Sequence, residues 1–359
     1  MIEVTKVTGL LACLICSVNS LWALPQNRPE SALVASDQAK IDDEVIQSMD
    51  AIGATAAALA VSYNGRVVYT KGYGYSDRRG RKPTSEKTAM RLASCTKPFT
   101  AAAIRELIRQ GKVKADTRVF DYLGILPNES LADKRIQKIT INDLLEHRGG
   151  WDRDQTFDPM YEIDRLKSEM GVSRITKKHI VRYMWDQPLQ HAPGTERSYS
   201  NFGFLLLGLV IEKATDKSYV VAVRELVTDP IKAGEVFLSS PVRGNRKSRE
   251  VFYPQENRLN LHLRDSASGL AAGAETLCYF MEHYWLDGRQ RQSRDGWFFY
   301  QVGTHPFCTS SFMEQREDGI SFSALFNRRR EDHYLDDNAQ IRKRLNRAID
   351  RIAEKLRVD

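Results

Sequence analysis

Strand-length apolar runs lie near both ends of this chain. An almost continuous run from Ala56 to Tyr63, the turn pair Asn64-Gly65 and a return from Arg66 to Lys71 predict a β-hairpin. Further along, three successive strands are predicted by the runs Trp297 to Val302, Cys308 to Met313 and Ile320 to Phe326, with Asp318-Gly319 as the turn between the last two. A long middle region separates the two groups of strands.

Other segments carry a helical period. Helices are predicted over Ile41 to Ile52, Ala101 to Arg109, Ile175 to Trp185 and Phe204 to Ile211, and a glycine-rich turn leads into a helix between Ser266 and Phe280. The last segment repeats apolar residues at helical spacing, namely Ile341, Leu345, Ile349, Ile352 and Leu356. We expect this stripe to cover the sheet.

The first residues resemble an export signal. Lys6 supplies a short charged start, Val7 to Val18 is largely apolar, and Ala23 offers a small residue for cleavage. The apolar run is short for a membrane span. We therefore expect a signal peptide over residues 1–23, a flexible tail over 24–40 and a periplasmic or extracellular protein. A membrane anchor, or lipid attachment at Cys13, is the weaker alternative.

Composition is that of an ordinary globular protein, with 42% hydrophobic and 28% charged residues in 359. The net charge is +7, but the basic groups Arg328-Arg329-Arg330 and Arg342-Lys343-Arg344 are not interleaved with aromatic residues. This favours solvated surface over nucleic-acid binding. Electrostatic association with acidic polymers of the cell envelope stays open, as does the oligomeric state.

Cysteine and histidine usage points to no cofactor. Removal of the leader would leave Cys95, Cys278 and Cys308, whose spacing fits neither a disulfide framework nor a metal site. One disulfide among the three is compatible with the sequence, which does not select the pair. The seven histidines show no ligand spacing, so we expect neither a metal nor an organic cofactor.

The first candidate for chemistry is Ser94-Cys95-Thr96-Lys97, just before the helix at Ala101. Positions three apart share a helix face, so Ser94 and Lys97 should be neighbours. A serine hydroxyl needs a base to become a nucleophile, and lysine can be that base when burial or the helix N-terminus lowers its pKa. On its own this spacing arises often by chance, with the serine as a helix cap.

The second candidate lies before the apolar helix that starts near Phe204. Tyr199 and Asn201 could be a buried aromatic residue and a helix cap. Beside a serine–lysine pair, however, the tyrosine hydroxyl could carry a proton to a leaving group, its pKa lowered by the lysine. An asparagine amide could hold both the lysine and a substrate carbonyl. His147, by contrast, is more typical of a hydrogen-bonded structural histidine.

Taken in order, these residues resemble the class C β-lactamase-related serine hydrolases, a family of penicillin-binding-protein-like esterases, peptidases and β-lactamases. Ser94-x-x-Lys97 is similar to the first family motif and Tyr199-x-Asn201 to the second. Leu144-Leu145-x-His147-x-Gly149-Gly150 resembles a Leu-Leu-x-His-x-Ser-Gly landmark, with Gly149 where serine is usual. Ser268-Gly269-Leu270 resembles the turn that precedes the next helix.

The third motif departs from the family. There the family has Lys or His, then Thr or Ser, then Gly, and this chain has Gln301-Val302-Gly303. A shifted alignment would use His305 as the cation. Because the family's cation and hydroxyl help to hold a substrate carboxylate, their absence predicts an esterase or D-amino-acid peptidase-like enzyme rather than an efficient β-lactamase.

The resemblance implies a single α/β (α+β) domain over residues 41–359, with a β-lactamase/transpeptidase-like fold. It has an antiparallel sheet flanked by helices and an inserted helical lobe over about 83–290. The implied roles are Ser94 as nucleophile, Lys97 and Tyr199 as proton relay, and Asn201, Gln301 and Gly303 as orienting residues. The backbone N–H groups of Ser94 and Thr304 would bind the oxyanion. The rival interpretation is a catalytically impaired envelope-binding protein that keeps the fold.

Overall fold

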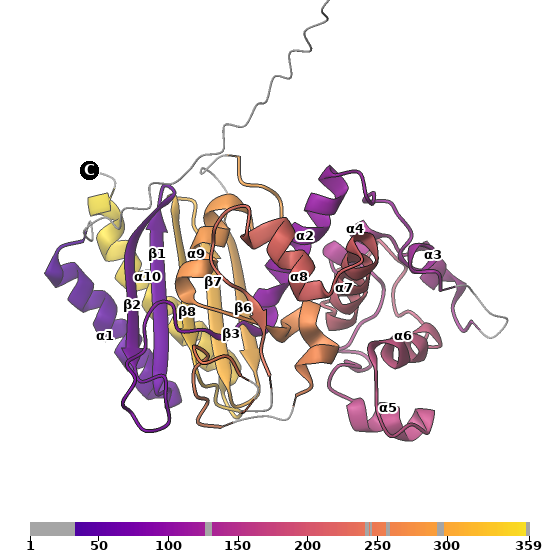
Figure 1. Cartoon of the computed structure of the whole chain (residues 1–359), viewed down its shortest axis with the longest axis horizontal. Helices are drawn as coiled ribbons and strands as arrows, with labels where there is room; N and C mark the ends of the chain where they lie inside the picture. The colour runs from indigo at the N-terminus through magenta and orange to yellow at the C-terminus, as the bar shows by residue number, and fades with distance from the viewer. Residues whose placement is uncertain are drawn as a thin grey trace, which may run out of the picture.

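The computed structural model describes residues 33–125, 131–240, 244, 246–255, 259–292 and 298–356. Figure 1 shows two parts side by side: an antiparallel sheet with its covering helices, and a helical lobe formed by the middle of the chain. The predicted fold class, an antiparallel sheet flanked by helices with an inserted helical lobe, is confirmed. The predicted signal peptide lies outside the described residues.

The large sheet joins strands from both ends of the sequence. It is formed by β1 (Ala56–Tyr63), β2 (Arg66–Gly74), β6 (Phe299–His305), β7 (Thr309–Gln315) and β8 (Ile320–Phe326). Their order is β2-β1-β8-β7-β6, and every neighbouring pair is antiparallel. β1 therefore pairs with its hairpin partner on one side and with the last strand of the chain on the other. This order makes β6 an edge strand.

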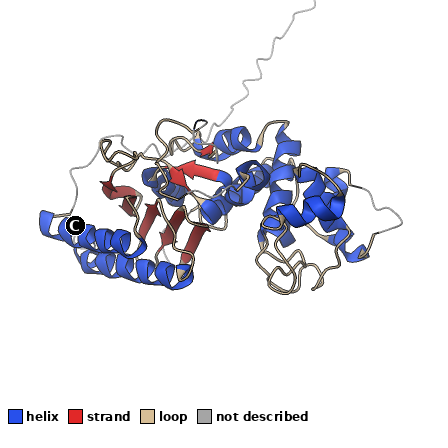
Figure 2. Cartoon of the chain, turned by 90° about the horizontal axis from the view of Figure 1, so that it is seen from below, coloured by secondary structure: helices blue, strands red, loops and turns tan. Residues whose placement is uncertain are grey.

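Two long helices cover one face of this sheet. α1 (Ala35–Ile52) and α10 (Tyr334–Leu356) run along each other beneath the strands, as Figure 2 shows. The predicted stripe on α10 is buried at the four positions whose side chains the structure describes, Ile341, Leu345, Ile349 and Leu356. Alternate residues of β7 and β8, among them Phe312 and Phe322, pack against this pair from above.

The start of α1 corrects one expectation. Residues 35–40, which we assigned to a flexible tail, form the first turns of this helix. Leu33 is buried in the same core cluster, and Lys355 of α10 donates to the buried carboxylate of Asp37 at 2.5 Å. A contact between residues more than 300 positions apart orders this segment, and no local pattern indicates it.

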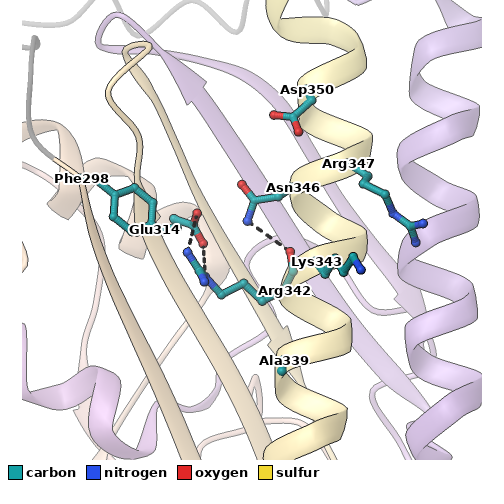
Figure 3. A pocket seen from close by; sticks show the side chains of 8 residues that line it. All are labelled: Phe298, Glu314, Ala339, Arg342, Lys343, Asn346, Arg347 and Asp350. Carbon is teal, nitrogen blue, oxygen red and sulfur yellow. Dashed lines mark hydrogen bonds and ion pairs between the residues drawn. The ribbon is translucent and has the colours of Figure 1, made fainter.

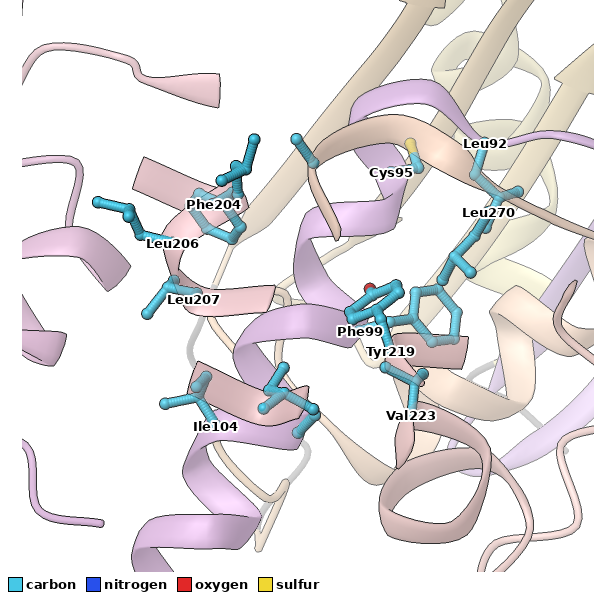
Figure 4. Packing of buried hydrophobic residues seen from close by; sticks show 14 of the residues in the cluster. Leu92, Cys95, Phe99, Ile104, Phe204, Leu206, Leu207, Tyr219, Val223 and Leu270 are labelled. Atoms are coloured by element: carbon cyan, nitrogen blue, oxygen red, sulfur yellow. The ribbon is translucent and has the colours of Figure 1, made fainter. Parts of the chain in front are cut away.

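The other face of the sheet is covered by α9 (Ala274–His283), and the helical lobe extends from there past the β6 edge (Figure 1). The elements of the lobe include α2 (Lys97–Arg109), α3 (Val119–Leu123), α4 (Ile141–Leu145), α5 (Ile163–Met170), α6 (Lys177–Trp185), α7 (Asn201–Thr215) and α8 (Tyr219–Val223). A small sheet of β3 (Met90–Arg91), β5 (Leu270–Ala272) and β4 (Phe237–Leu238) connects the lobe to the large sheet. Figure 4 shows Phe99 and Ile104 of α2 among Phe204 and Leu207 of α7 and Tyr219 and Val223 of α8.

Several boundaries differ from those expected. α5 is a helix that the sequence analysis did not predict, and β6 continues past Val302 to His305. Trp297, the predicted first residue of that strand, lies outside the described residues. α2 and α7 follow the apolar pattern closely because their buried sides pack on each other. Within the part of the chain that the structure describes, no helix has the length and hydropathy needed to cross a bilayer.

Candidate active site

The nucleophile candidate lies on a tight turn at the start of α2. Residues Ala93–Thr96 form one 3₁₀ turn that passes directly into α2 at Lys97, with Pro98 in its first turn. Ala93 has a φ of 47°, a conformation that a residue with a side chain seldom adopts. Cys95 is buried, and the single S–H of its thiol faces the carbonyls of Gln301 and Ser311, with Sγ 3.4 and 3.6 Å from their oxygens. The turn is thus bonded to β6 and β7, with Ser94 half-buried at its surface.

Lys97 is a buried lysine with its amine surrounded by oxygen atoms. Its Nζ donates to Asn201 Oδ1 at 2.7 Å and to the carbonyl of Ala267 at 2.8 Å, and lies 3.3 Å from Ser94 Oγ. Burial lowers the pKa of Lys97 to about 7, although the charge of Asp158 opposes this shift. The expected direction is confirmed. A large fraction of the lysine is therefore neutral near pH 7 and can accept a proton.

Tyr199 approaches Ser94 from the segment that precedes α7. Its hydroxyl donates to Ser94 Oγ at 2.7 Å, and the Nζ of Lys97 lies 4.7 Å from the centre of its ring. Burial raises the pKa of Tyr199 to about 12, against a smaller lowering by the bond to Ser94 and by Arg153. Our expectation of a lowered tyrosine pKa is therefore wrong. Near neutral pH Tyr199 holds its proton and is suited to donate it, while Lys97 is the better base.

His147 is a structural residue of this site. Its ring stacks on Tyr199 with centroids 4.6 Å apart, and its Nδ1 accepts from the backbone N–H of Ser200 at 3.1 Å. Burial lowers the pKa of His147 to about 3, so the ring stays neutral. His147 therefore positions Tyr199 and Ser200, as expected of the structural histidine that the sequence analysis predicted. The neighbouring Gly149 leaves room for Trp151, because a Cβ there would lie 3.1 Å from the indole ring.

Asn201 is the first residue of α7, which Ser200 caps by accepting from the N–H of Gly203 at 3.0 Å. While its amide oxygen faces Lys97, its Nδ2 donates to Asp158 Oδ2 at 2.6 Å. Arg153, on the same loop as Asp158, lies 3.4 Å from that carboxylate and 4.7 Å from the centre of the Tyr199 ring. Neither Asp158 nor Arg153 was predicted from the sequence.

The edge strand β6 forms the opposite wall. Gly303 lies directly against the nucleophile turn: a Cβ at this position would be 2.2 Å from the carbonyl oxygen of Leu92 and 2.8 Å from the backbone nitrogen of Cys95. Ser311 Oγ of β7 donates to the same Leu92 carbonyl at 2.6 Å. Only glycine fits this contact, which brings Thr304, the next residue, close to the turn that carries Ser94.

The remaining residues of the third motif offer no free cation. Gln301 donates its side-chain amide to the carbonyl of Val302 at 2.8 Å, and Val302 packs against the core cluster on the α1–α10 side. His305 is fully buried, with Nε2 2.8 Å from the carbonyl of Ser268, and burial holds its pKa well below the ordinary value. The shifted alignment that uses His305 as a cation therefore does not fit. The Thr304 hydroxyl accepts from Arg329 at 3.3 Å, and Arg329 is paired with Glu331.

The described residues form neither a disulfide nor a metal site. The three described cysteines are buried and none of them is in a disulfide, and the described residues contain no group of His, Cys, Asp or Glu side chains arranged to hold a metal ion. Figure 3 shows a groove beside α10, lined in part by Phe298, Glu314 and Arg342. Glu314 alternates with Met313 along β7, so the groove lies on the α10 face of the sheet, opposite the nucleophile turn.

The chain is similar to known proteins over most of its length. A family model described as Beta-lactamase matches residues 41–345. The chain is 30% identical to the esterase EstB of Burkholderia gladioli over 204 residues, which cover 56% of this chain and 51% of that protein. It is 28% identical to an N-acetylmuramyl-L-alanine amidase of Bacillus subtilis over 212 residues, covering 56% of this chain and 47% of the other. The matches thus span about half the length of these relatives.

Solved structures share the fold at lower identity. The D-amino acid amidase of Ochrobactrum anthropi SV3 has a TM-score of 0.64 at 19% identity, covering 88% of this chain and 98% of the amidase. A β-lactamase/D-alanine carboxypeptidase of Yersinia pestis has a TM-score of 0.65 at 16% identity, with 87% and 98% covered. EstCE1, a hydrolase with promiscuous acyltransferase activity, has a TM-score of 0.64 at 19% identity, with 87% and 100% covered.

Proposed function

Because the chain belongs to the Beta-lactamase family of serine hydrolases, we propose that it cleaves an ester or amide bond through an acyl-enzyme on Ser94. One observation carries the proposal. Ser94 Oγ lies 3.3 Å from the amine of Lys97, whose pKa is about 7, and accepts a hydrogen bond of 2.7 Å from Tyr199. A hydroxyl between a neutral base and a proton donor is the arrangement that acyl transfer needs.

The proposed reaction runs in two halves. Ser94 Oγ attacks the acyl carbon while its proton passes to the neutral amine of Lys97, and the negative charge develops on the acyl oxygen. The backbone N–H groups of Ser94 and Thr304 would hold that oxygen. When the tetrahedral intermediate collapses, Tyr199 protonates the leaving alcohol or amine and recovers a proton from Lys97. Water then attacks the ester on Ser94 with the same groups in reverse roles, releasing the acid.

The substrate class follows from the third motif. Gln301 bonds to its own strand and supplies no charge, so a substrate carboxylate would lack the usual cation at this position. We therefore propose short acyl esters or amides, including D-amino-acid amides, as better substrates than β-lactams. The esterase EstB and the D-amino acid amidase among the similar proteins favour this choice.

A fluorophosphonate probe tests the proposal, since it reacts only with an activated serine. Wild-type protein should be labelled and should hydrolyse short nitrophenyl esters, whereas Ser94→Ala should lose both activities. Ser198→Ala is a matched control in the Tyr199 segment, because the backbone of Ser198, and not its side chain, donates to His147. An unlabelled wild type with no turnover of esters or amides would instead support the envelope-binding protein.

A further inference from the structure

A closed ring of contacts surrounds the amine of Lys97. The lysine donates to Asn201 and to the carbonyl of Ala267; Asn201 donates to Asp158. Asp158 Oδ1 accepts from the backbone N–H of Met160 at 3.0 Å, and the carbonyl of Met160 accepts from the guanidinium of Arg264. Arg264 ends the turn that leads to Ala267, which closes the ring.

We propose that Asp158 is a positioning residue for the proton relay: its carboxylate holds the Asn201 amide with the oxygen toward Lys97, and its negative charge stabilises the proton that Lys97 receives. This inference rests on the proposed function, because it concerns the same lysine. It adds a residue that no motif of the sequence contains.

The first part follows from hydrogen-bond chemistry. An asparagine amide has one end that donates and one that accepts, whereas an ionised carboxylate only accepts. With Asp158 Oδ2 2.6 Å away, Asn201 must turn its NH₂ group to the carboxylate. Its oxygen is then left for the amine of Lys97, at 2.7 Å. Without Asp158 the amide could rotate and direct its NH₂ group at the lysine.

The second part follows from the charges around the lysine. Asp158 is the carboxylate that acts on Lys97, and its side chain is only 10% exposed, so solvent screens it weakly. The opposing charges are Arg153, on the loop of Asp158, and the buried Arg264 on the turn before Ala267. Cys95 packs behind as a buried thiol with its pKa raised to about 12, and His147 is neutral. The charge of Asp158 therefore raises the pKa of Lys97, whereas burial of the lysine and the charges of the two arginines lower it.

The test compares Asp158→Asn and Asp158→Ala with a control on the same loop, Asp154→Asn. The side chain of Asp154 is 86% exposed, and among the residues that the structure describes its carboxylate reaches Arg153 alone, at 3.7 Å. The asparagine variant keeps the size of the side chain and can still accept a hydrogen bond, so it removes mainly the charge. Protein labelled with ¹³C-lysine gives the Lys97 titration by NMR, assigned with Lys97→Met, and needs no turnover.

Removal of the carboxylate should shift the titration of Lys97 about one to three pH units lower, because a nearby opposite charge favours the protonated amine by that amount. In the pH profile of kcat/KM for a neutral ester, the midpoint of the rise on the acidic side should also shift to lower pH. Asp158→Ala should lower kcat about tenfold or more with KM changed less than threefold, and Asp154→Asn should match the wild type in every measurement.

A purely structural role for Asp158 would lower the melting temperature and leave the lysine titration in place. If both Asp158 variants titrate like the wild type, the inference is overturned. An absence of turnover in the wild type would count against the proposed function instead, and the NMR titration would still decide the role of Asp158.

Discussion

Replacement of Gly303 by alanine tests whether β6 sets the geometry of the active site. The added Cβ would lie 2.2 Å from the Leu92 carbonyl, 2.5 Å from Ser311 Oγ and 2.8 Å from the Cys95 nitrogen. Two of these atoms belong to the backbone and cannot rotate away. Because ordinary contact begins near 3.4 Å, β6 and the nucleophile turn must separate by about 1 Å.

This displacement should affect both stability and rate. Overpacking of this kind destabilises a protein by about 1–3 kcal/mol, which corresponds to a melting temperature lower by roughly 2–10 °C in a domain of this size. A catalytic geometry displaced by about 1 Å loses about 100-fold in rate. We therefore expect Gly303→Ala to fold, to melt a few degrees lower and to lose about 100-fold in kcat/KM for a nitrophenyl ester.

Gly203→Ala is the matched control. Gly203 lies in α7 two residues after Asn201, and the nearest atom to its added Cβ would be 3.5 Å away, an ordinary contact. Alanine in a helix is about 0.5–1 kcal/mol more favourable than glycine, so this variant should keep its activity and melt slightly higher. Wild-type kcat/KM in Gly303→Ala would refute the conclusion that this strand defines the site.

Three further predictions concern the base, specificity and export. The folded-state pKa of Lys97 is about 7, below its unfolded value of 10.5, so kcat/KM should rise with pH through about 7 and the free energy of unfolding should increase between pH 7 and pH 10.5. Lys97→Met should abolish both trends. A flat rate profile between pH 5 and 8 would contradict the role of the lysine. Gln301→Lys should raise nitrocefin acylation about tenfold or more over ester cleavage, and an equal change for both substrates would show that this position does not set specificity. Mature protein should begin near Leu24 outside the cytoplasm, and N-terminal sequencing that finds Met1 on cytoplasmic protein would disprove export.

The sequence predicts the residues that carry the proposed chemistry better than it predicts the residues that contact them. A three-residue spacing at a helix start placed Ser94 beside Lys97, and the structure brings both together with Tyr199 and Asn201. The approach of Tyr199 to Ser94 came from the family resemblance, because no local period connects residues more than 100 positions apart. The lowered tyrosine pKa failed for a physical reason: burial raises the pKa more than the bond to Ser94 and the charge of Arg153 lower it.

No pattern in the sequence identifies the groups that surround the catalytic residues. Asp158 is one of several acidic residues in a polar loop, and nothing in its spacing distinguishes it from Asp152 or Asp154. The carbonyl of Ala267 is a backbone group, present at every position. Val302 shows a different limit: the resemblance says only that the usual hydroxyl is missing at this position, whereas strand alternation turns the Val302 side chain toward the α1–α10 face.

The pairing of β1 with β8 affects how this protein folds. Ala57 pairs with Phe326, so one edge of the apolar strand β1 has no partner until nearly the entire chain has been synthesised. Such long-range pairing slows folding and leaves an aggregation-prone edge exposed in the meantime. The ion pair between Asp37 and Lys355 holds the outer ends of α1 and α10 together. A circular permutant that links those ends and opens the chain in the exposed turn at Gly80 would make all five strands consecutive, and it should refold faster than the natural order.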